Sequence, residues 1–256
     1  AKEGADFKNE MNSLEDAALR NTETSYFPEE GNFLRRNLIR SCIENEGLDA
    51  DDVSLICDPS QDQLAAGSVL KSKKVIFSGE ELWSYKSNIV KAVIHHEISH
   101  LRHNDSEILI ILKAFENSKY FKSEYSGFLE RLKKEVSSEK EYRADMEAAT
   151  YSLDNAKNFI EFLISTFLRN MKTIISVLAL PAGNEFVKIY YQALSAVKPS
   201  EEYLKDYDKE GFCKLAKAIK RDFNQCYDKT HPSDYKRIEA IRAIMLECEQ
   251  EAKEIA

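Results

Sequence analysis

Hydrophobic positions along the chain recur mainly at helical spacing. Apolar side chains three and four residues apart predict a helix over residues 30–46, with Gly47 as its C-terminal cap. A β-branched run predicts a strand over 53–57, and residues 63–78 predict a hairpin or meander. Within it, 74–78 is the clearest strand. From about residue 86 onward almost the whole pattern is helical.

These elements predict an α+β, predominantly α-helical fold with a small β-sheet. Only 8 glycines and 5 prolines occur among 256 residues, which argues against a turn-rich sandwich or barrel. No fixed-period repeat and no linker rich in Gly or Ser interrupts the chain, so we expect a single domain over residues 1–256. The polar residues 1–25 are expected to form a mobile or regulatory segment of that domain.

The most apolar stretch, residues 159–181, is interrupted by Glu161, Arg169 and Lys172. No run of 18 apolar residues exists, so no membrane span is expected, and residues 159–181 are interpreted as a buried or amphipathic helix pair.

The amino-acid composition argues against several classes of protein. The hydrophobic fraction of 43% is too high for a disordered chain. The formal net charge of -8 argues against a nucleic-acid partner, which requires a basic surface. The five cysteines form no CxxC pair, which favours buried thiols in a reducing compartment such as the cytoplasm. The first residues contain no apolar run, so no signal peptide is expected. The chain begins with Ala, so export is kept as an alternative. The sequence does not indicate the oligomeric state.

Four of the five histidines fall between positions 95 and 103, and His96, Glu97 and His100 form an HExxH motif. On a helix, residues four apart share one face, so two imidazoles can converge on one metal ion. The carboxylate of Glu97 can then act as general base on a water molecule. An apolar stripe (Val90, Ile94, Ile98, Leu101) is expected on the face opposite the His pair. The alternative is a surface His cluster that matches the motif by chance.

His95 and His103 are not expected to bind the same metal. His103 lies about 10.5 Å along the helix axis from His96, too far for one ion that also contacts His100. His95 is rotated by about 100° from His96. Structural roles are therefore favoured for both histidines.

A catalytic zinc site needs a third protein ligand and an open position. No third His follows at a short spacing, so a downstream carboxylate is expected. Glu141 and Asp145 stand out, because they lie four residues apart on one predicted helix, where Glu141 can bind the metal and Asp145 can orient His96. An ordinary solvated helix face is the equally weighted alternative from spacing alone.

Four segments together resemble the HtpX and CAAX-prenyl-endopeptidase family of zinc metallopeptidases, which belongs to the gluzincins. They are AVIHHEISHLRHND around the HExxH motif, EYRADMEAA from Glu141, the region from Gln63 to Gly79, and Thr230–Ser233 with Arg237 and Ile238. The segments follow the family's order and span roughly residues 50–240.

The resemblance implies a role for each matching residue. His96, His100 and Glu141 would bind one zinc ion per chain, Glu97 would be the base and Asp145 would support a ligand. His231 would lie near the metal and contact the tetrahedral intermediate or occupy the open position, with an ordinary helix-capping loop as the alternative. Arg237 would anchor that loop through an acidic partner. The strand with Val75, Ile76, Phe77 and Ser78 would bind an extended substrate by edge pairing.

The expected function is therefore a soluble zinc-dependent endopeptidase that cleaves protein or peptide substrates. Many family members carry membrane helices or lipid anchors, so the family's membrane substrates do not carry over. One alternative is a silent or autoinhibited zinc-binding interaction module, closed by His231 or by residues 1–25. A purely structural zinc site and a DNA-associated HExxH protease are disfavoured, the first by the adjacent Glu97 and the second by the net charge.

Overall fold

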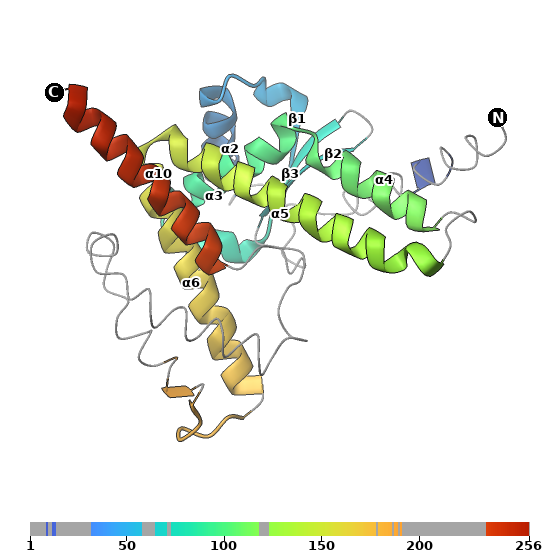
Figure 1. Cartoon of the computed structure of the whole chain (residues 1–256). Helices are drawn as coiled ribbons and strands as arrows, with labels where there is room; N and C mark the ends of the chain where they lie inside the picture. Colours follow the sequence, from blue (N-terminus) through green and yellow to red (C-terminus); the bar gives the residue numbers. More distant parts are fainter. Residues whose placement is uncertain are drawn as a thin grey trace. The chain divides into compact units, whose positions relative to one another are not determined.

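The structure is a computed structural model of the 256-residue chain, shown in Figure 1. It describes residues 32–57, 65–70, 73–117, 123–177 and 234–255, with shorter pieces at 9, 12–13, 179–185, 187–188 and 190. Contacts divide the chain into two compact units, Ala1–Glu147 and Ala148–Ala256. The single domain expected from the sequence stays a prediction. The architecture is α+β and predominantly helical, which confirms the predicted fold class.

The first unit begins with helix α2, Asn32–Asn45, close to the predicted bounds. Gly47 ends it in the left-handed conformation, with φ +73°. The N–H of Leu48 then bonds the carbonyl of Ile43 over 3.2 Å, which is the pattern of a glycine C-cap. A short 3₁₀ helix, η1 (Ala50–Asp52), leads into the sheet.

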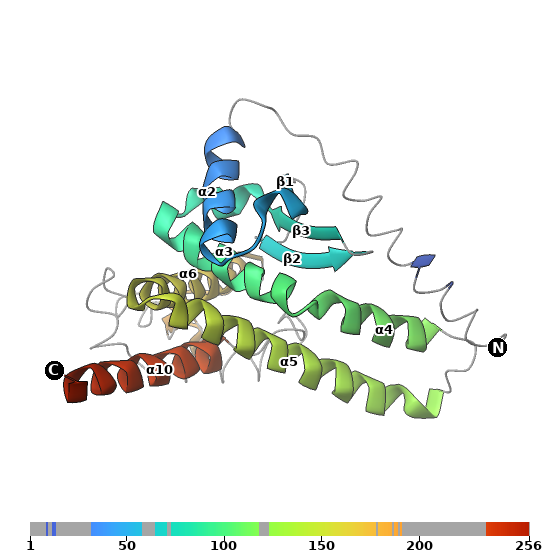
Figure 2. The same cartoon turned by 90° about the horizontal axis from the view of Figure 1, so that it is seen from above.

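Three strands form one mixed sheet in the order β1-β3-β2 (Figure 2). They are β1 (Val53–Cys57), β2 (Ala65–Leu70) and β3 (Lys73–Ser78). Strands β2 and β3 pair antiparallel, with Gly67 opposite Ile76, which confirms the predicted hairpin. Strand β1 pairs parallel with β3, with Leu55 also opposite Ile76.

This strand order corrects the predicted substrate strand. Strand β3, which carries Val75, Ile76, Phe77 and Ser78, lies in the centre and is paired on both sides. Its main-chain groups are therefore committed to β1 and β2, so it has no free edge for a substrate. Val75, Ile76 and Ser78 are also buried. The outer strands are β1 and β2.

Three helices complete the first unit after the 3₁₀ turn η2 (Glu80–Ser84). They are α3 (Ser87–Arg102), α4 (Asp105–Asn117) and α5 (Ser126–Tyr151), with the 3₁₀ turn η3 (Ser123–Tyr125) before the last; the unit boundary falls within α5. Figures 1 and 2 show α4 and α5 side by side, and the ion pair between Glu116 and Lys133 joins them. Helix α3 contacts β2 more extensively than β3.

Helix α3 is buried along most of its length. The stripe Val90, Ile94, Ile98 and Leu101 is buried as predicted, but so are His95, His96, Glu97 and His100. Burial of α3 therefore extends beyond the predicted apolar stripe to the side that carries the His pair. Polar side chains buried in this way need partners, and those partners define the site.

The second unit is built on α6 (Leu153–Val177) and α10 (Asp234–Ile255), which pack against each other. Their buried side chains include Phe159, Leu163 and Phe167 of α6 and Ile238 and Ile241 of α10. Residues 159–177 belong to one helix, so the predicted helix pair is wrong. No helix in the described part of the chain is long and apolar enough to cross a membrane.

Candidate active site

His96 and His100 lie on adjacent turns of α3 and face the same side. Their imidazole rings have centroids 4.8 Å apart, and their Nε2 atoms are 3.1 Å apart. Two ring nitrogens at this separation, both within a buried stretch of helix, are unlike a solvated His cluster. The chance surface cluster considered above is therefore excluded for this pair.

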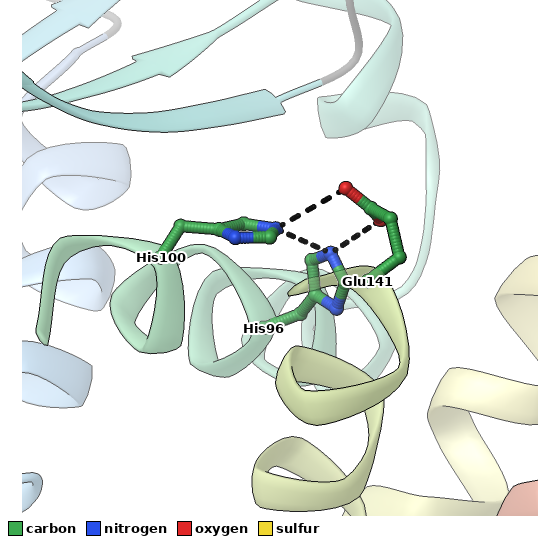
Figure 3. Close-up of side chains that lie close together, drawn as sticks. All are labelled: His96, His100 and Glu141. Carbon is green, nitrogen blue, oxygen red and sulfur yellow. Dashed lines mark hydrogen bonds and ion pairs between the residues drawn. The ribbon is translucent and has the colours of Figure 1, made fainter. Parts of the chain in front are cut away.

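Helix α5 brings a carboxylate to the same point, as Figure 3 shows. Glu141 Oε2 lies 3.4 Å from His96 Nε2, and Glu141 Oε1 lies 3.5 Å from His100 Nε2. Within the described residues, His96, His100 and Glu141 form the group that could hold a metal ion. The alternative of an ordinary solvated face for Glu141 is thus excluded.

The separations among these donor atoms fit a zinc ion. Ligands about 2.0–2.1 Å from a tetrahedral zinc stand about 3.3–3.4 Å from one another. The observed values of 3.1, 3.4 and 3.5 Å bracket that spacing. Two imidazoles and one carboxylate also leave a fourth position open, as catalytic zinc sites do.

Each ligand histidine has a carboxylate at its other ring nitrogen. Asp145 Oδ1 lies 3.0 Å from His96 Nδ1, and Asp105 Oδ2 lies 2.8 Å from His100 Nδ1. Asp145 is fully buried, and Asp105 is buried as well. Carboxylates at Nδ1 select the tautomer whose Nε2 is free to bind a metal. The spacing of Glu141 and Asp145 predicts the pairing of Asp145 with His96, whereas no sequence motif indicates Asp105.

The carboxylates also set the charge of His96. Burial alone lowers the pKa of His96, but Asp145 and Glu141 raise it, and the net result is a pKa of about 10. The raised pKa favours the protonated imidazole, which lies beside the carboxylates of Glu141 and Asp145. A metal ion that binds there replaces this proton.

Glu97 faces strand β2. Its Oε2 accepts a hydrogen bond of 2.6 Å from the main-chain N–H of Gly67. A Cβ atom at Gly67 would lie 2.2 Å from the carbonyl oxygen of Glu97, so only glycine fits at this contact. The sequence indicated Glu97 from the motif but gave no reason to single out Gly67, because the contact joins residues 30 positions apart.

The two remaining histidines of the cluster have carboxylate partners away from the ligand group. His95 Nδ1 lies 2.7 Å from Glu46 Oε1, and the pKa of His95 is lowered, chiefly by burial, although Glu46 opposes the shift. His103 Nε2 lies 2.6 Å from Glu147 Oε1. Arg102 bonds both Glu46 and Glu147. Neither histidine belongs to the metal-binding group, in agreement with the structural roles expected for them.

Two predicted residues belong to the C-terminal part of the chain. His231 lies outside the described residues, as do nearly all of residues 1–25, so the alternative of a closed site that rests on them stays a prediction. Arg237 is buried on α10 of the second unit, and its guanidinium carbon lies 5.8 Å from the centroid of the Phe159 ring. Its proposed anchoring of the His231 loop also stays a prediction.

Comparison with known proteins gives one match. A model of peptidase family M48 matches residues 34–245, which include all three residues of the metal-binding group. No curated protein and no solved structure gives a significant match to the chain. Because the family match covers most of the sequence, the chain belongs to peptidase family M48, a family of zinc-dependent metallopeptidases.

Proposed function

We propose that this metallopeptidase is an endopeptidase that binds one zinc ion through His96, His100 and Glu141 and cleaves protein or peptide substrates. The observation that carries the proposal is the convergence of three donor side chains from α3 and α5 at spacings suited to zinc. A bound zinc would polarise the scissile carbonyl and make water a better nucleophile. The order of the sequence motifs further supports a member of the HtpX and CAAX-prenyl-endopeptidase type.

Glu97 is proposed as the general base. It follows the ligand His96 directly, and its carboxylate is held from one side by Gly67. A carboxylate fixed in this way can take a proton from water and return it to the leaving amine without first reorganising. Asp145 orients His96 in this proposal. His231 is proposed to face the same metal and to stabilise the developing oxyanion, with Arg237 anchoring its loop.

The substrate is proposed to pair with β2 instead of β3. In an antiparallel strand the N–H and C=O of one residue point to the same side. Since the Gly67 N–H reaches Glu97, the main-chain groups of Gly67 point away from β3. Alternation puts those of Ala65 and Val69 on the same outer edge. An extended peptide could pair with this edge beside the base through main-chain hydrogen bonds, which require little sequence specificity.

A reducing compartment such as the cytoplasm is proposed for the protein. The support is the cysteine pattern without a CxxC pair, together with the free, buried thiol of Cys42.

Peptide profiling tests the proposed activity. The full chain is incubated with a mixed peptide library, and new termini are identified by mass spectrometry. We expect internal cleavages that a zinc chelator abolishes and added zinc restores, and that are absent with the Glu97→Gln variant. Termini trimmed only from peptide ends would contradict endopeptidase activity. Cleavage that persists equally in the Glu97→Gln variant would contradict the assignment of the base.

A further inference from the structure

Asp105 makes three interactions at one buried point of the first unit. Its Oδ2 lies 2.8 Å from His100 Nδ1. Its Oδ1 accepts a hydrogen bond from the Arg143 guanidinium, and its main-chain carbonyl accepts one from the Lys140 ammonium. The residue is only 4% exposed. Asp105 is not a member of the metal-binding group, yet it touches two separate helices around that group.

A tight turn places Asp105 there. Only His103 and Asn104 separate α3 from α4, and Asn104 adopts the left-handed conformation with φ 53°. Asn tolerates this conformation better than most residues. The chain therefore reverses within two residues, and Asp105, the first residue of α4, reaches back to the imidazole of His100.

The partners of Asp105 on α5 flank a metal ligand. Lys140 precedes Glu141 directly, and Arg143 follows Glu141 by two positions. Lys140 and Arg143 both donate hydrogen bonds to Asp105. These two bonds restrict the rotation of this turn of α5 and its shift along the helix axis. The residue beside His100 is therefore also bonded to the turn of α5 that carries Glu141.

We propose that Asp105 is a positioning residue that holds two metal ligands from different helices, His100 of α3 and Glu141 of α5, in register before the metal binds. The proposal rests on the proposed zinc site. It differs from the role of Asp145, which lies on α5 itself and faces His96.

A purely structural role would join α4 to α5 without affecting metal binding. The chain offers a matched control for that role, because Glu116 and Lys133 form an ion pair between the same two helices. Glu116 and Lys133 belong to neither the metal-binding group nor the hydrogen bonds of Asp105. Loss of the Glu116–Lys133 pair should therefore affect helix packing alone.

The test measures metal binding by the full chain after zinc has been removed with a chelator. Zinc affinity is determined by competition with a chromophoric chelator, and ligand geometry by the visible absorption of bound Co²⁺. The variants are Asp105→Asn, Arg143→Gln and Glu116→Gln, and the unfolding of each zinc-free variant is measured separately. In Asp105→Asn one carboxylate oxygen becomes an NH2 group, which cannot accept, so the hydrogen bond to either His100 or Arg143 is lost.

We expect Asp105→Asn to weaken zinc binding by about 10–100-fold and to change the Co²⁺ spectrum. Arg143→Gln, which keeps the bond to His100, should weaken zinc binding by about tenfold. Glu116→Gln should leave the affinity within about twofold of the native value, since it removes only an exposed ion pair.

Native-like affinity in Asp105→Asn would overturn the proposal. If Asp105→Asn does not fold, the Arg143→Gln variant provides the test. A native zinc affinity in Arg143→Gln would overturn the claim that Asp105 positions Glu141. An equal loss in Glu116→Gln would assign the effect to helix packing and would also overturn it. A native chain that binds no zinc would instead contradict the proposed function, so the two failures are distinguishable.

Discussion

Gly67 and Glu97, 30 residues apart in the sequence, meet where strand β2 crosses helix α3. The N–H of Gly67 donates to Glu97 Oε2 over 2.6 Å, and the Cα of Gly67 approaches so closely that a Cβ would lie 2.2 Å from the Glu97 carbonyl oxygen. This contact connects the sheet to the residue proposed as the base. It makes the outer edge of β2, and not the central strand β3, the part of the sheet beside the site.

Substitution of Gly67 by Ala should therefore damage both the fold and the activity. The added methyl group must push β2 from α3, at a cost of about 1–3 kcal/mol in the free energy of unfolding. Displacing β2 by about 1 Å should lower peptide hydrolysis by about a hundredfold. Urea denaturation and a peptide cleavage assay measure the two effects.

Gly127→Ala is the control for this prediction. Gly127 lies in α5, where an added Cβ meets no atom within 4 Å, so alanine should be tolerated and should not lower stability. Equal stability and equal activity of the two variants would show that the contact between β2 and α3 does not matter.

The carboxylate of Glu46 should stabilise the fold without affecting zinc affinity. It bonds the buried His95 at 2.7 Å and Arg102 at 2.5 Å. Glu46→Ala leaves the buried ring nitrogen of His95 without this partner, which should cost about 1–3 kcal/mol in the free energy of unfolding. Urea denaturation of the zinc-free protein measures the loss, and chelator competition should give a native zinc affinity.

Glu80→Ala provides the comparison for Glu46. Glu80 pairs with Arg35 at an exposed position, so its removal should change stability by no more than about 1 kcal/mol. Should Glu46→Ala prove as mild as Glu80→Ala, or lower zinc affinity strongly, His95 would not have the structural role assigned to it.

The thiol of Cys42 should resist alkylation in the folded chain. Burial raises the pKa of Cys42 from 9.0 to about 11, although Lys91 partly opposes this. The raised pKa reduces the thiolate fraction at pH 8 by about a hundredfold, and the thiolate is the reactive form. Peptide mapping after iodoacetamide treatment should show slow labelling of Cys42 in native protein and ordinary labelling in urea. Equally fast labelling in both conditions would argue against its burial.

The raised Cys42 pKa also fixes the sign of a stability effect. The unfolded chain ionises this thiol at lower pH than the folded chain. The contribution of Cys42 to stability is therefore complete below about pH 9 and is lost as the pH rises toward 11.

Local spacing predicts His96 and His100 as ligands, whereas Glu141 is favoured over a solvated helix face only by the resemblance to the metallopeptidase family. His96 and His100 are four residues apart on one helix, and Glu141 and Asp145 repeat the same spacing on another. Helical periodicity places the two residues of each pair on one face, and His and Glu are residue types that bind zinc. The predicted helix before Gly47 and the hairpin from β2 to β3 were recovered for similar local reasons.

What could not be predicted depends on non-local geometry. Asp105 reaches His100 only because Asn104 takes a left-handed conformation, which no hydrophobic period encodes. The central position of β3 depends on parallel pairing with β1, about 20 residues earlier in the chain. A continuous apolar run such as Val75–Phe77 is typical of a strand that is covered on both faces, and this signal favours a central strand over an edge strand.

The most direct test of the central claim compares the native chain with the Glu97→Gln variant, by zinc content and by cleavage of casein. The amide oxygen of Gln can still accept from Gly67, and the ligands His96, His100 and Glu141 are unchanged, so we predict one zinc ion per chain in both proteins. Casein cleavage should fall by at least about a hundredfold in the variant, since the amide cannot take a proton from water. A variant that binds zinc and cleaves casein at the native rate would contradict the account.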